Sequence, residues 1–323
     1  MSIEEPATIG VVQLGRLGDM VLTTPLIEAL AVRFPASRIT VLAAPAAASI
    51  ARHAPGATDV FEVGRGAIGL AGAVMRLQMR SFDLYIDPKD HHSSSSRMLA
   101  RSAHARRVIA HPSNAPQEFI ALPPTPPPGH YVDRMLAPMS LLAPGSTPDR
   151  RPHIGLPSEA TVIAARVRAA VGDEYAVVNI SAGAPSRHWT VERTVALAQW
   201  LAERTPVVIV GTPSDRPTAH AIATTAADIV AADTGDLLEL AAVVAGATFV
   251  VSPDTSVVHV ASAYDIPTVG LYPENPDNLR LFAPLATRQA VVSAPAGGSV
   301  ADIDVEQVIE AIERLGVTAP AMP

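Results

Sequence analysis

The stretch Val251-Ser252-Pro253-Asp254-Thr255-Ser256-Val257-Val258-His259 connects an apolar run to a segment with helical spacing. The run before the turn, Ala247 to Val251, is short, β-branched and uninterrupted, which is typical of a strand buried on both faces of a parallel sheet. The segment Val257–Tyr264 has the apolar spacing of a helix. The turn is therefore expected at the carboxyl end of a buried strand and the amino end of a helix, where proteins bind anions.

Polar residues of this turn suit a phosphate ligand. Thr255 and Ser256 offer hydroxyls and free backbone N–H groups, the helix dipole favours negative charge, and His259 lies one turn further on the same side. The alternative is an ordinary helix cap, in which Asp254 or Thr255 satisfies the first N–H groups and His259 packs in the interior. The turn alone leaves both interpretations open.

Composition restricts the class of protein. The chain has 323 residues, of which 48% are hydrophobic and 17% charged, and its strand-helix alternation predicts an α/β protein of about two domains. No stretch approaches the roughly 18 unbroken apolar residues of a membrane span, and the N-terminus lacks the basic region of a signal peptide, so we expect a cytoplasmic protein. The absence of cysteine excludes disulfides, thiolate catalysis and Cys-ligated metals.

Charge is divided unevenly along the chain. The net charge of −7 argues against general nucleic-acid binding. Residues 1–150 carry 14 Lys/Arg against 12 Asp/Glu, whereas residues 151–323 carry 10 against 19. The basic residues of the first half concentrate in Arg65, Arg76, Arg80, Lys89, Arg97, Arg101, Arg106 and Arg107. This stretch is either a surface that attracts an anionic lipid or a phosphorylated acceptor, or an ordinary solvated face.

The first half predicts one doubly wound domain over residues 1–150. Helical patterns begin near Met20, Ala46, Ala67 and Ser94, between the expected strands. Those strands are Thr8–Gln13, Arg38–Ala43, Asp59–Val63, Asp83–Ile86 and Arg107–Ala110. The Pro-rich stretch Leu122–Gly129 predicts an extended surface connection, followed by a helix over His130–Leu142. We expect the domain linker near residues 144–157.

The second half, residues 151–323, repeats the scheme. Its strands are expected at Tyr175–Ile180, Val207–Val210, Ala247–Val251 and Thr268–Leu271. Its helices are expected near Val191–Glu203, Pro217–Ala226, Leu237–Ala245 and Thr255–Tyr264. A terminal helix over Val305–Leu315 follows with no further strand, so it is free to pack on either domain, including back on the first.

A second strand-to-helix turn carries an acid. The strand Ile9–Gln13 leads into Leu14-Gly15-Arg16-Leu17-Gly18-Asp19-Met20, and a helix is expected over Val21–Arg33. Gly15 and Gly18 allow a ligand to approach the backbone, and Asp19 would face an interdomain cleft. The alternative is that Asp19 is only a helix cap. The spacing is not G-x-G-x-x-G, so no nicotinamide site is predicted.

Three motifs together resemble the family 9 glycosyltransferases, best known from the ADP-heptose:lipopolysaccharide heptosyltransferases. The motifs are Leu17-Gly18-Asp19-Met20-Val21-Leu22-Thr23-Thr24-Pro25, Ser181-Ala182-Gly183 through Arg187-His188-Trp189, and Asp254-Thr255-Ser256-Val257-Val258-His259. The resemblance spans nearly the whole chain. It implies a GT-B fold of two Rossmann-like domains facing a cleft, with the acceptor held by the first and the nucleotide sugar by the second. It also implies inverting transfer without a metal or other cofactor.

The resemblance also implies roles for individual residues. Asp19 looks like the general base that deprotonates the acceptor hydroxyl. Thr255, Ser256 and Arg187 would neutralise the leaving diphosphate, and Asp254 in similar enzymes contacts hydroxyls of the donor sugar. The full donor set is Ser181, Gly183, Arg187, Asp215, Asp254, Thr255, Ser256 and His259. The donor implied is ADP-heptose, and the acceptor is a glycan or glycolipid, with peripheral contact at the inner membrane.

Four positions depart from the family pattern. Arg187 stands where lysine is usual, and Asp215 stands where a ribose-binding Glu is common. Ser256 replaces the usual Gly, and Trp189-Thr190 replaces Trp-Pro. These departures indicate a divergent member, which either uses a different nucleotide sugar or builds a product other than inner-core lipopolysaccharide.

The segment Asp87-Pro88-Lys89-Asp90-His91-His92 follows the strand Asp83–Ile86 at the expected acceptor side. With Gly18, its residues Asp87, Lys89 and His91 are the candidate acceptor contacts. A metal site of Asp87, Asp90, His91 and His92 is the less favoured alternative, because adjacent histidines diverge and the spacing matches no usual signature.

Other functions remain as alternatives. A Ser/His/Asp hydrolase is disfavoured, because no G-x-S-x-G elbow is present and Pro253 follows Ser252. A GT-B enzyme acting on a UDP-sugar, such as an epimerase or phosphorylase, would share the phosphate-binding turn. A degenerate member that only binds nucleotide or a partner is a further possibility. Product formation that depends on donor and on Asp19 would separate the transferase from the binding protein.

Overall fold

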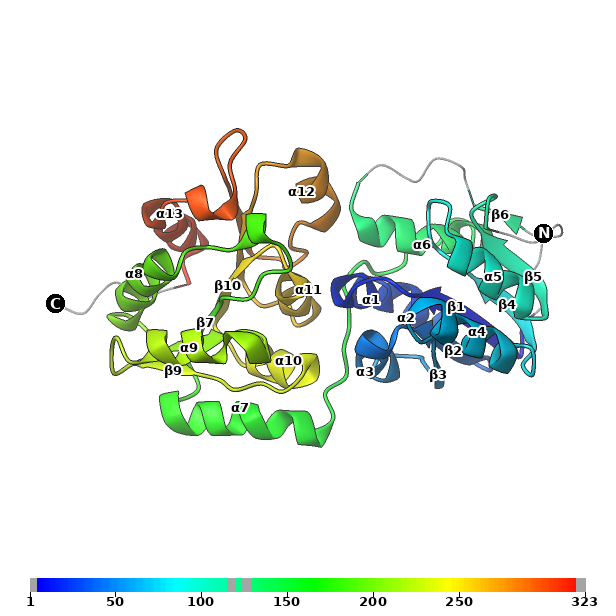
Figure 1. The fold of residues 1–323 in the computed structure, drawn as a ribbon, viewed down its shortest axis with the longest axis horizontal. Helices are drawn as coiled ribbons and strands as arrows, with labels where there is room; N and C mark the ends of the chain where they lie inside the picture. Colours follow the sequence, from blue (N-terminus) through cyan, green and yellow to red (C-terminus); the bar gives the residue numbers. More distant parts are fainter. Residues whose placement is uncertain (1–4, 115–119, 123–128, 318–323) are drawn as a thin grey trace. The chain divides into compact units, whose positions relative to one another are not determined.

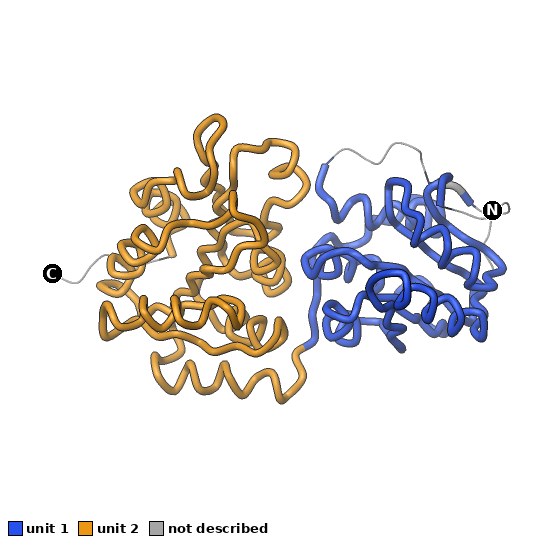
Figure 2. The backbone as a smooth tube through the Cα atoms, viewed as in Figure 1, with its two compact units in different colours: residues 1–155 blue, residues 156–323 orange. Residues whose placement is uncertain are grey.

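The chain folds into two compact units, residues 1–155 and residues 156–323 (Figure 2). The structure is a computed structural model and describes residues 5–114, 120–122 and 129–317. The division after Gly155 lies within the linker expected near residues 144–157. The extended connection expected at the Pro-rich stretch lies for residues 123–128 outside the described part of the chain.

The first unit is built on a six-stranded parallel sheet with the order β3-β2-β1-β4-β5-β6 (Figure 1). Its strands are β1 (Thr8–Gln13), β2 (Arg38–Ala43), β3 (Asp59–Glu62), β4 (Phe82–Ile86), β5 (Ala105–Ala110) and β6 (Ile120–Ala121). The register pairs Ile9 with Ile39 on one side and with Leu84 on the other. The central strands are apolar along their length because helices cover both of their faces.

Among the described residues of the first unit, six helices accompany this sheet. They are α1 (Leu17–Val21), α2 (Thr24–Arg33), α3 (Ala48–Arg52), α4 (Gly66–Leu77), α5 (Ser94–Ser102) and α6 (Tyr131–Leu142), with a short 3₁₀ turn, η1 (Pro45–Ala47), before α3. Helix α4 packs against α5, and α2 packs against α6. The buried sides of α4 and α5 share one core cluster with Phe61, Phe82 and Tyr85 of the sheet.

The second unit repeats the architecture with the order β12-β11-β10-β7-β8-β9, again all parallel. Its strands are β7 (Ala176–Asn179), β8 (Val207–Val210), β9 (Ile229–Ala231), β10 (Phe249–Pro253), β11 (Thr268–Tyr272) and β12 (Gln289–Ser293). Its helices are α7 (Ser158–Val171), α8 (Val191–Ala202), α9 (Arg216–Ala223), α10 (Leu237–Ala245), α11 (Ser256–Ala263), α12 (Pro276–Phe282) and α13 (Val305–Leu315). Three 3₁₀ turns complete it, η2 (Pro185–Arg187), η3 (Pro213–Asp215) and η4 (Val300–Asp302).

Each sheet has one point where the strand order reverses. In the first unit it lies between β1 and β4, and in the second between β7 and β10. Ligands of doubly wound proteins bind outside the carboxyl ends of the strands at such a point. None of the helices in the described ranges is long and apolar enough to cross a membrane.

Several elements differ from those expected from the sequence. The helix expected over Val21–Arg33 is broken into α1 and α2, because Pro25 has no N–H to donate into a continuous helix and the Thr24 hydroxyl bonds the carbonyl of Val21 at 2.8 Å. Helices α7 and α12 and the edge strands β6, β9 and β12 were missed. These strands are short or half-exposed, so they lack the unbroken apolar run that marks the central strands.

The terminal helix α13 packs on the second unit, not back on the first. It contacts β12, β11 and α8, and Val308, Ala311 and Ile312 are buried in the second core. The outward side of the helix carries exposed acids such as Glu313. The apolar stripe of α13 is therefore part of the core of the second unit.

Ile312→Ala is expected to destabilise the second unit by about 2–5 kcal/mol, because it leaves a cavity in a filled core. Both tryptophans of the chain, Trp189 and Trp200, lie in this unit, so urea unfolding followed by tryptophan fluorescence reports it selectively. Glu313→Ala on the exposed side of the same helix is the control and should leave the midpoint unchanged. An unchanged midpoint for Ile312→Ala would contradict the packing of α13.

Candidate functional site

Asp19 lies at the carboxyl edge of the first sheet, in the short helix α1 that follows β1. The side chain is half-buried, and its Oδ2 accepts a hydrogen bond of 2.8 Å from the backbone N–H of Arg16. No donor among the described residues reaches Oδ1. Burial raises the pKa of the Asp19 carboxyl above its usual value, although the Arg16 N–H and the charges of Arg16 and Lys89 act in the opposite direction.

Glycine is required at position 15 by side chains of the protein itself. A Cβ at position 15 would lie 2.2 Å from Oδ2 of Asp19 and 2.8 Å from Oε1 of Gln13. The close approach that requires glycine here is therefore made by the Asp19 carboxylate, whereas the sequence alone suggested an approaching ligand. Asp19 therefore caps the start of α1 through Oδ2 and leaves Oδ1 without a hydrogen-bond partner among the described residues.

A buried polar network supports the Asp19 loop. Gln13, at the end of β1, accepts from the N–H of Gly15 at 2.9 Å and donates to the Thr23 hydroxyl at 2.9 Å. Thr23 in turn donates to the carbonyl of Asp19 at 2.7 Å. Tyr131, at the start of α6, also hydrogen-bonds with Gln13, and burial together with the negative charge of Asp19 raises the pKa of its hydroxyl. These contacts fix the carboxylate of residue 19 without using its second oxygen.

Asp87 and Lys89 follow β4, the strand next to β1. Asp87 is buried, and its Oδ1 accepts from the N–H of Lys89 at 3.2 Å. Burial raises the pKa of the Asp87 carboxyl, opposed by that N–H, the nearby Ser96 hydroxyl and the charges of Lys89 and His91. Neither Oδ2 of Asp87 nor the Ser96 hydroxyl meets hydrogen-bond geometry with a described residue. The Lys89 charge thus lies close to two carboxyls, those of Asp19 and Asp87.

Asp90 lies within ion-pair distance of both His91 and Arg134. The ring of His91 lies 2.8 Å from Oδ1 of Asp90 and is largely exposed, and Arg134 of α6 lies 2.5 Å from Oδ2 of Asp90. Burial opposes ionisation of Asp90, but these two partners outweigh it and lower its pKa. Over residues 5–114, 120–122 and 129–317, no three His, Asp or Glu side chains converge as a metal site would require. The alternative of a metal held by Asp87, Asp90, His91 and His92 therefore finds no support.

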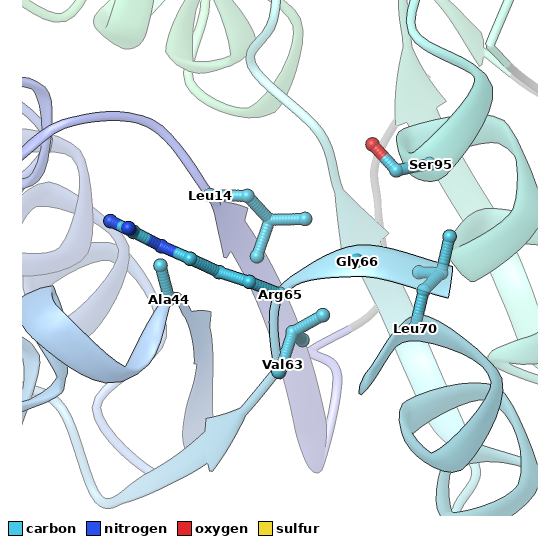
Figure 3. Close-up of a pocket in the computed structure, with 8 residues that line it drawn as sticks. Leu14, Ala44, Val63, Arg65, Gly66, Leu70 and Ser95 are labelled. Atoms are coloured by element: carbon cyan, nitrogen blue, oxygen red, sulfur yellow. The ribbon is translucent and has the colours of Figure 1, made fainter. Parts of the chain in front are cut away.

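A pocket of about 300 Å³ opens in the first unit (Figure 3). Its walls come from the ends of three strands and the starts of two helices: Leu14, Ala44, Val63, Gly64, Arg65, Gly66, Leu70 and Ser95. Leu14 directly precedes Gly15, so the pocket adjoins the Asp19 loop. The lining is mainly apolar, with the Arg65 side chain as its one cation and the Ser95 hydroxyl at the far wall.

In the second unit, Asn179 joins the two strands at the reversal point. It ends β7 and is buried. Its amide donates to the hydroxyls of Ser252 at 2.9 Å and Thr255 at 3.1 Å, both on the β10 side. Its oxygen accepts from the N–H and the hydroxyl of Ser181 at 3.0 and 2.8 Å. One amide side chain therefore fixes both loops that the sequence assigned to the donor.

The turn after β10 forms the N-terminus of α11. Thr255 is the N-cap, with its hydroxyl accepting from Val257 N–H at 3.3 Å, as the capping interpretation predicted. The N–H of Ser256, at the first helical position, makes no hydrogen bond to any described residue. His259 is buried one turn later, with its ring 6.1 Å from that of Phe282. Ser252 is fully buried and donates to the carbonyl of Pro253, so it cannot serve as a hydrolase nucleophile.

Arg187 is held beside this turn by Asp254. Its Nε lies 3.2 Å from Oδ2 of Asp254, and its Nη1 donates to the Asp254 carbonyl at 3.1 Å. Asn278 of α12 also donates to Oδ2 of Asp254, at 2.6 Å. The guanidinium is mostly buried and oriented, and its position is set by the carboxylate that follows β10.

The remaining donor candidates lie on neighbouring loops. Ser181 and Gly183 follow β7, where Gly183 is exposed and a Cβ there would meet only open space. Asp215 follows β8, next to β7 in the sheet, and its Oδ2 accepts from the N–H and hydroxyl of Thr212 at 2.8 and 2.5 Å. One oxygen of Asp215 is thus used to shape its own turn.

The sequence analysis missed five residues that build these clusters: Gln13, Thr23, Tyr131, Asn179 and Asn278. Asn179 carried a usable signal, since it is a polar residue at the end of an apolar strand. Lys89, which the sequence analysis did name as a candidate acceptor contact, is the only lysine of the chain. Asn278 carried no such signal, as it reaches Asp254 from a helix 24 residues further along the sequence.

A family model described as glycosyltransferase family 9 (heptosyltransferase) matches residues 75–311, well over half of the chain. A search of curated protein sequences returned no match. Among solved structures, the family 9 glycosyl transferase from Veillonella parvula DSM 2008 is similar with a TM-score of 0.83 and 21% identity, covering 98% of this chain and 98% of that chain.

Two further solved structures differ in how similar their folds are to that of this chain. Heptosyltransferase WaaC from E. coli, solved with ADP, gives a TM-score of 0.77 at 21% identity, over 95% of this chain and 99% of that one. The UDP-GlcNAc 2-epimerase from Methanocaldococcus jannaschii gives only 0.52 at 12% identity, over 95% and 92%. The fold is therefore the GT-B type of two Rossmann-like domains. The chain belongs to glycosyltransferase family 9 and is a glycosyltransferase.

Proposed function

We propose that the protein transfers a heptosyl group from ADP-heptose to a hydroxyl of a glycan or glycolipid, with inversion and without a metal. The observation that carries the proposal is the half-buried Asp19 carboxylate at the strand-reversal point of the first unit, with one oxygen held and one available. Family membership supports glycosyl transfer. The ADP bound to the similar WaaC structure and the family's heptosyltransferase description support the donor.

Asp19 suits a general base in the proposed reaction. A neutral hydroxyl is a poor nucleophile, and a carboxylate takes its proton more readily when burial has raised the pKa of that carboxyl. The Arg16 N–H and the charges of Arg16 and Lys89 oppose this rise and favour the ionised carboxylate. One base and one displacement at the anomeric carbon invert its configuration, since the hydroxyl attacks opposite the leaving diphosphate.

The second unit supplies the groups that the leaving diphosphate requires. The Ser256 N–H and the α11 dipole favour negative charge at that helix end. Arg187 adds a guanidinium that Asp254 holds in place. Hydroxyls of Ser181 and Thr255 lie beside them, both bonded to Asn179. Electrostatic stabilisation by such groups needs no metal ion, and we propose that Asp254 and Asp215 also contact the sugar and the ribose.

The acceptor would occupy the first unit. Lys89 and His91 would contact its polar groups, with Gly18 at the base of the Asp19 loop, whereas buried Asp87 would act by holding Lys89. The adjoining pocket offers apolar walls and one guanidinium, from Arg65. That lining suits an acceptor with a hydrophobic portion and an anionic group. A glycolipid acceptor would place the enzyme at the cytoplasmic face of the inner membrane.

Asp19→Asn is expected to lower kcat for heptosyl transfer from ADP-heptose by about 10²–10⁴-fold, the usual contribution of a general base. The amide keeps the size of the side chain and loses its basicity. ADP affinity, measured by calorimetry, should be unchanged because nucleotide is assigned to the other unit. Full activity of Asp19→Asn would show that another group is the base.

The pH profile of kcat/KM gives an independent check. The base acts only when ionised, and burial raises the pKa of Asp19. Activity should therefore rise with pH through a midpoint above about 3.9, the ordinary value for aspartate, and be lost below it. In Lys89→Gln the midpoint should move to higher pH, because the neighbouring cation that lowers the pKa is removed. A midpoint at or below the ordinary value would be inconsistent with this role.

Asn179→Ala is expected to weaken ADP binding by about tenfold or more and to cost about 1–3 kcal/mol of stability, because buried hydroxyls lose their partner. Asn179→Asp keeps the acceptor for Ser181 but loses the donor to Thr255 and adds a negative charge beneath the proposed diphosphate site, so it should bind ADP more weakly than Asn179→Ala. Titration calorimetry with ADP, UDP and GDP measures the affinity for each nucleotide, and urea unfolding measures the stability. Unchanged ADP affinity in Asn179→Ala would refute the proposed diphosphate site. Tighter binding of UDP than of ADP by the natural chain would indicate a UDP-sugar as the donor.

A further inference from the structure

Helix α4 of the first unit has an apolar stripe on its outer side. Ile68, Met75 and Met79 are 91%, 68% and 88% exposed. Ile68 and Met75 are seven residues apart within α4 and so lie on one side of it, and Met79 lies in the turn that follows Leu77, the last residue of the helix. The opposite side buries Ala73 and Leu77 in the core. The exposed apolar side chains are therefore not the ones that pack α4 onto the core.

Helix α5 continues this exposed surface. It packs beside α4 (Figure 1), buries Leu99 and Ala100, and exposes Arg97, Met98 and Arg101. We call the α4–α5 surface the set Ile68, Met75, Met79, Arg97, Met98 and Arg101. Of the exposed large apolar side chains in the described residues, it holds four, and the others, Val32, Val162 and Val191, lie singly on other helices. Scattered exposed apolar residues are ordinary, but a contiguous set marks an interaction site.

The α4–α5 surface carries positive charge without any acid. Residues 63–82 and 91–114 contain no Asp or Glu, although the chain as a whole has a net charge of −7. Arg97 and Arg101 form no ion pair with a described residue. Arg80, in contrast, pairs with Asp59, and Arg76 donates to the carbonyl of Glu62. The unpaired guanidiniums therefore lie on α5, next to the exposed apolar side chains of α4.

We propose that the α4–α5 surface docks the enzyme on an anionic phospholipid bilayer. This inference rests on the proposed function, in which the acceptor is a glycolipid. Ile68, Met75 and Met79 enter the boundary between headgroups and acyl chains, and Arg97 and Arg101 bind lipid phosphates, which is how amphipathic helices lie on a membrane. No described helix crosses the bilayer, so the contact is peripheral.

Charge favours lipid over a second copy of the chain. A twofold dimer places the same patch on both partners, so it would bring the arginines of two acid-free surfaces together. Burial of like charges without counter-charges is unfavourable. A bilayer containing phosphatidylglycerol supplies both an apolar layer and the missing negative charge.

The two helices that carry the α4–α5 surface also line the pocket of the first unit. Arg65 and Gly66, at the amino end of α4, and Ser95, in the first turn of α5, line the pocket (Figure 3). Ile68 lies two residues beyond Gly66 on the same helix. Binding of α4 and α5 to a bilayer would therefore keep the amino ends of both helices, and with them the pocket, near a membrane-anchored acceptor.

The test is co-flotation of the full chain with vesicles, without donor or acceptor. Vesicles of equal parts phosphatidylcholine and phosphatidylglycerol should bind the protein, and vesicles of phosphatidylcholine alone should not. High salt should release it, because screening shortens the reach of the arginine charges. Ile68→Gln/Met79→Gln and Arg97→Gln/Arg101→Gln should each weaken binding by about tenfold or more.

The matched control is Val162→Gln/Arg166→Gln, on the exposed side of α7 in the second unit. It removes one apolar and one cationic side chain and should bind vesicles like the natural chain. All these positions are exposed, so circular dichroism and ADP calorimetry should be unchanged in every variant. Heptosyl transfer to a detergent-solubilised acceptor should also be unchanged, which separates this inference from the proposed function.

Three outcomes would overturn the proposal. They are failure of the natural chain to bind the anionic vesicles, equal binding by the α4–α5 variants and the α7 control, and a dimer in solution that Ile68→Gln/Met79→Gln dissociates. Vesicle binding as expected with no transfer of any sugar would instead refute the proposed function and leave the membrane surface standing.

Discussion

The reversal of strand order in each sheet is the constraint on which both candidate sites depend. At β1 and β4, and again at β7 and β10, consecutive crossover connections leave toward opposite faces, so loops at adjacent strand ends diverge and leave room between them. In the first unit this places Asp19 near Lys89. In the second it places Asn179 against Thr255. The same topology thus positions the proposed proton acceptor in one unit and the proposed anion-binding helix end in the other.

Buried polar groups at these points are satisfied within the chain, and this sets the geometry of the reactive groups. Asn179 serves this purpose better than a charged residue, because one amide both donates and accepts and so connects two loops without adding charge beneath a diphosphate. Gln13 has the same role under Asp19. Such networks hold their members in place before a ligand arrives, which lowers the cost of reorganisation during reaction.

The central strands and the two turns that carry Asp19 and Thr255 could be predicted from the sequence. A buried parallel strand is a short apolar run, and its end is marked by polar or small residues. Asp19 and Thr255 were identified in that way. Contacts between distant segments could not be, which is why Asn278 and Tyr131 were missed and the requirement for Gly15 was attributed to a ligand. The apolar stripe of α13 fits either core, so only packing decided its unit. The acceptor and donor roles of the two units stay a prediction.

The single lysine of the chain has a chemical rationale in the proposed reaction. Every other side-chain cation of Lys or Arg type is arginine, and Lys89 is the one whose charge acts on the carboxyls of both Asp19 and Asp87, whereas that of Arg16 acts on Asp19. A guanidinium would bind one carboxylate through two parallel hydrogen bonds and hold it. A general base must instead keep an oxygen available for the acceptor proton. A compact ammonium supplies charge to both carboxyls without engaging both oxygens of either, so it favours the ionised base while leaving it able to react.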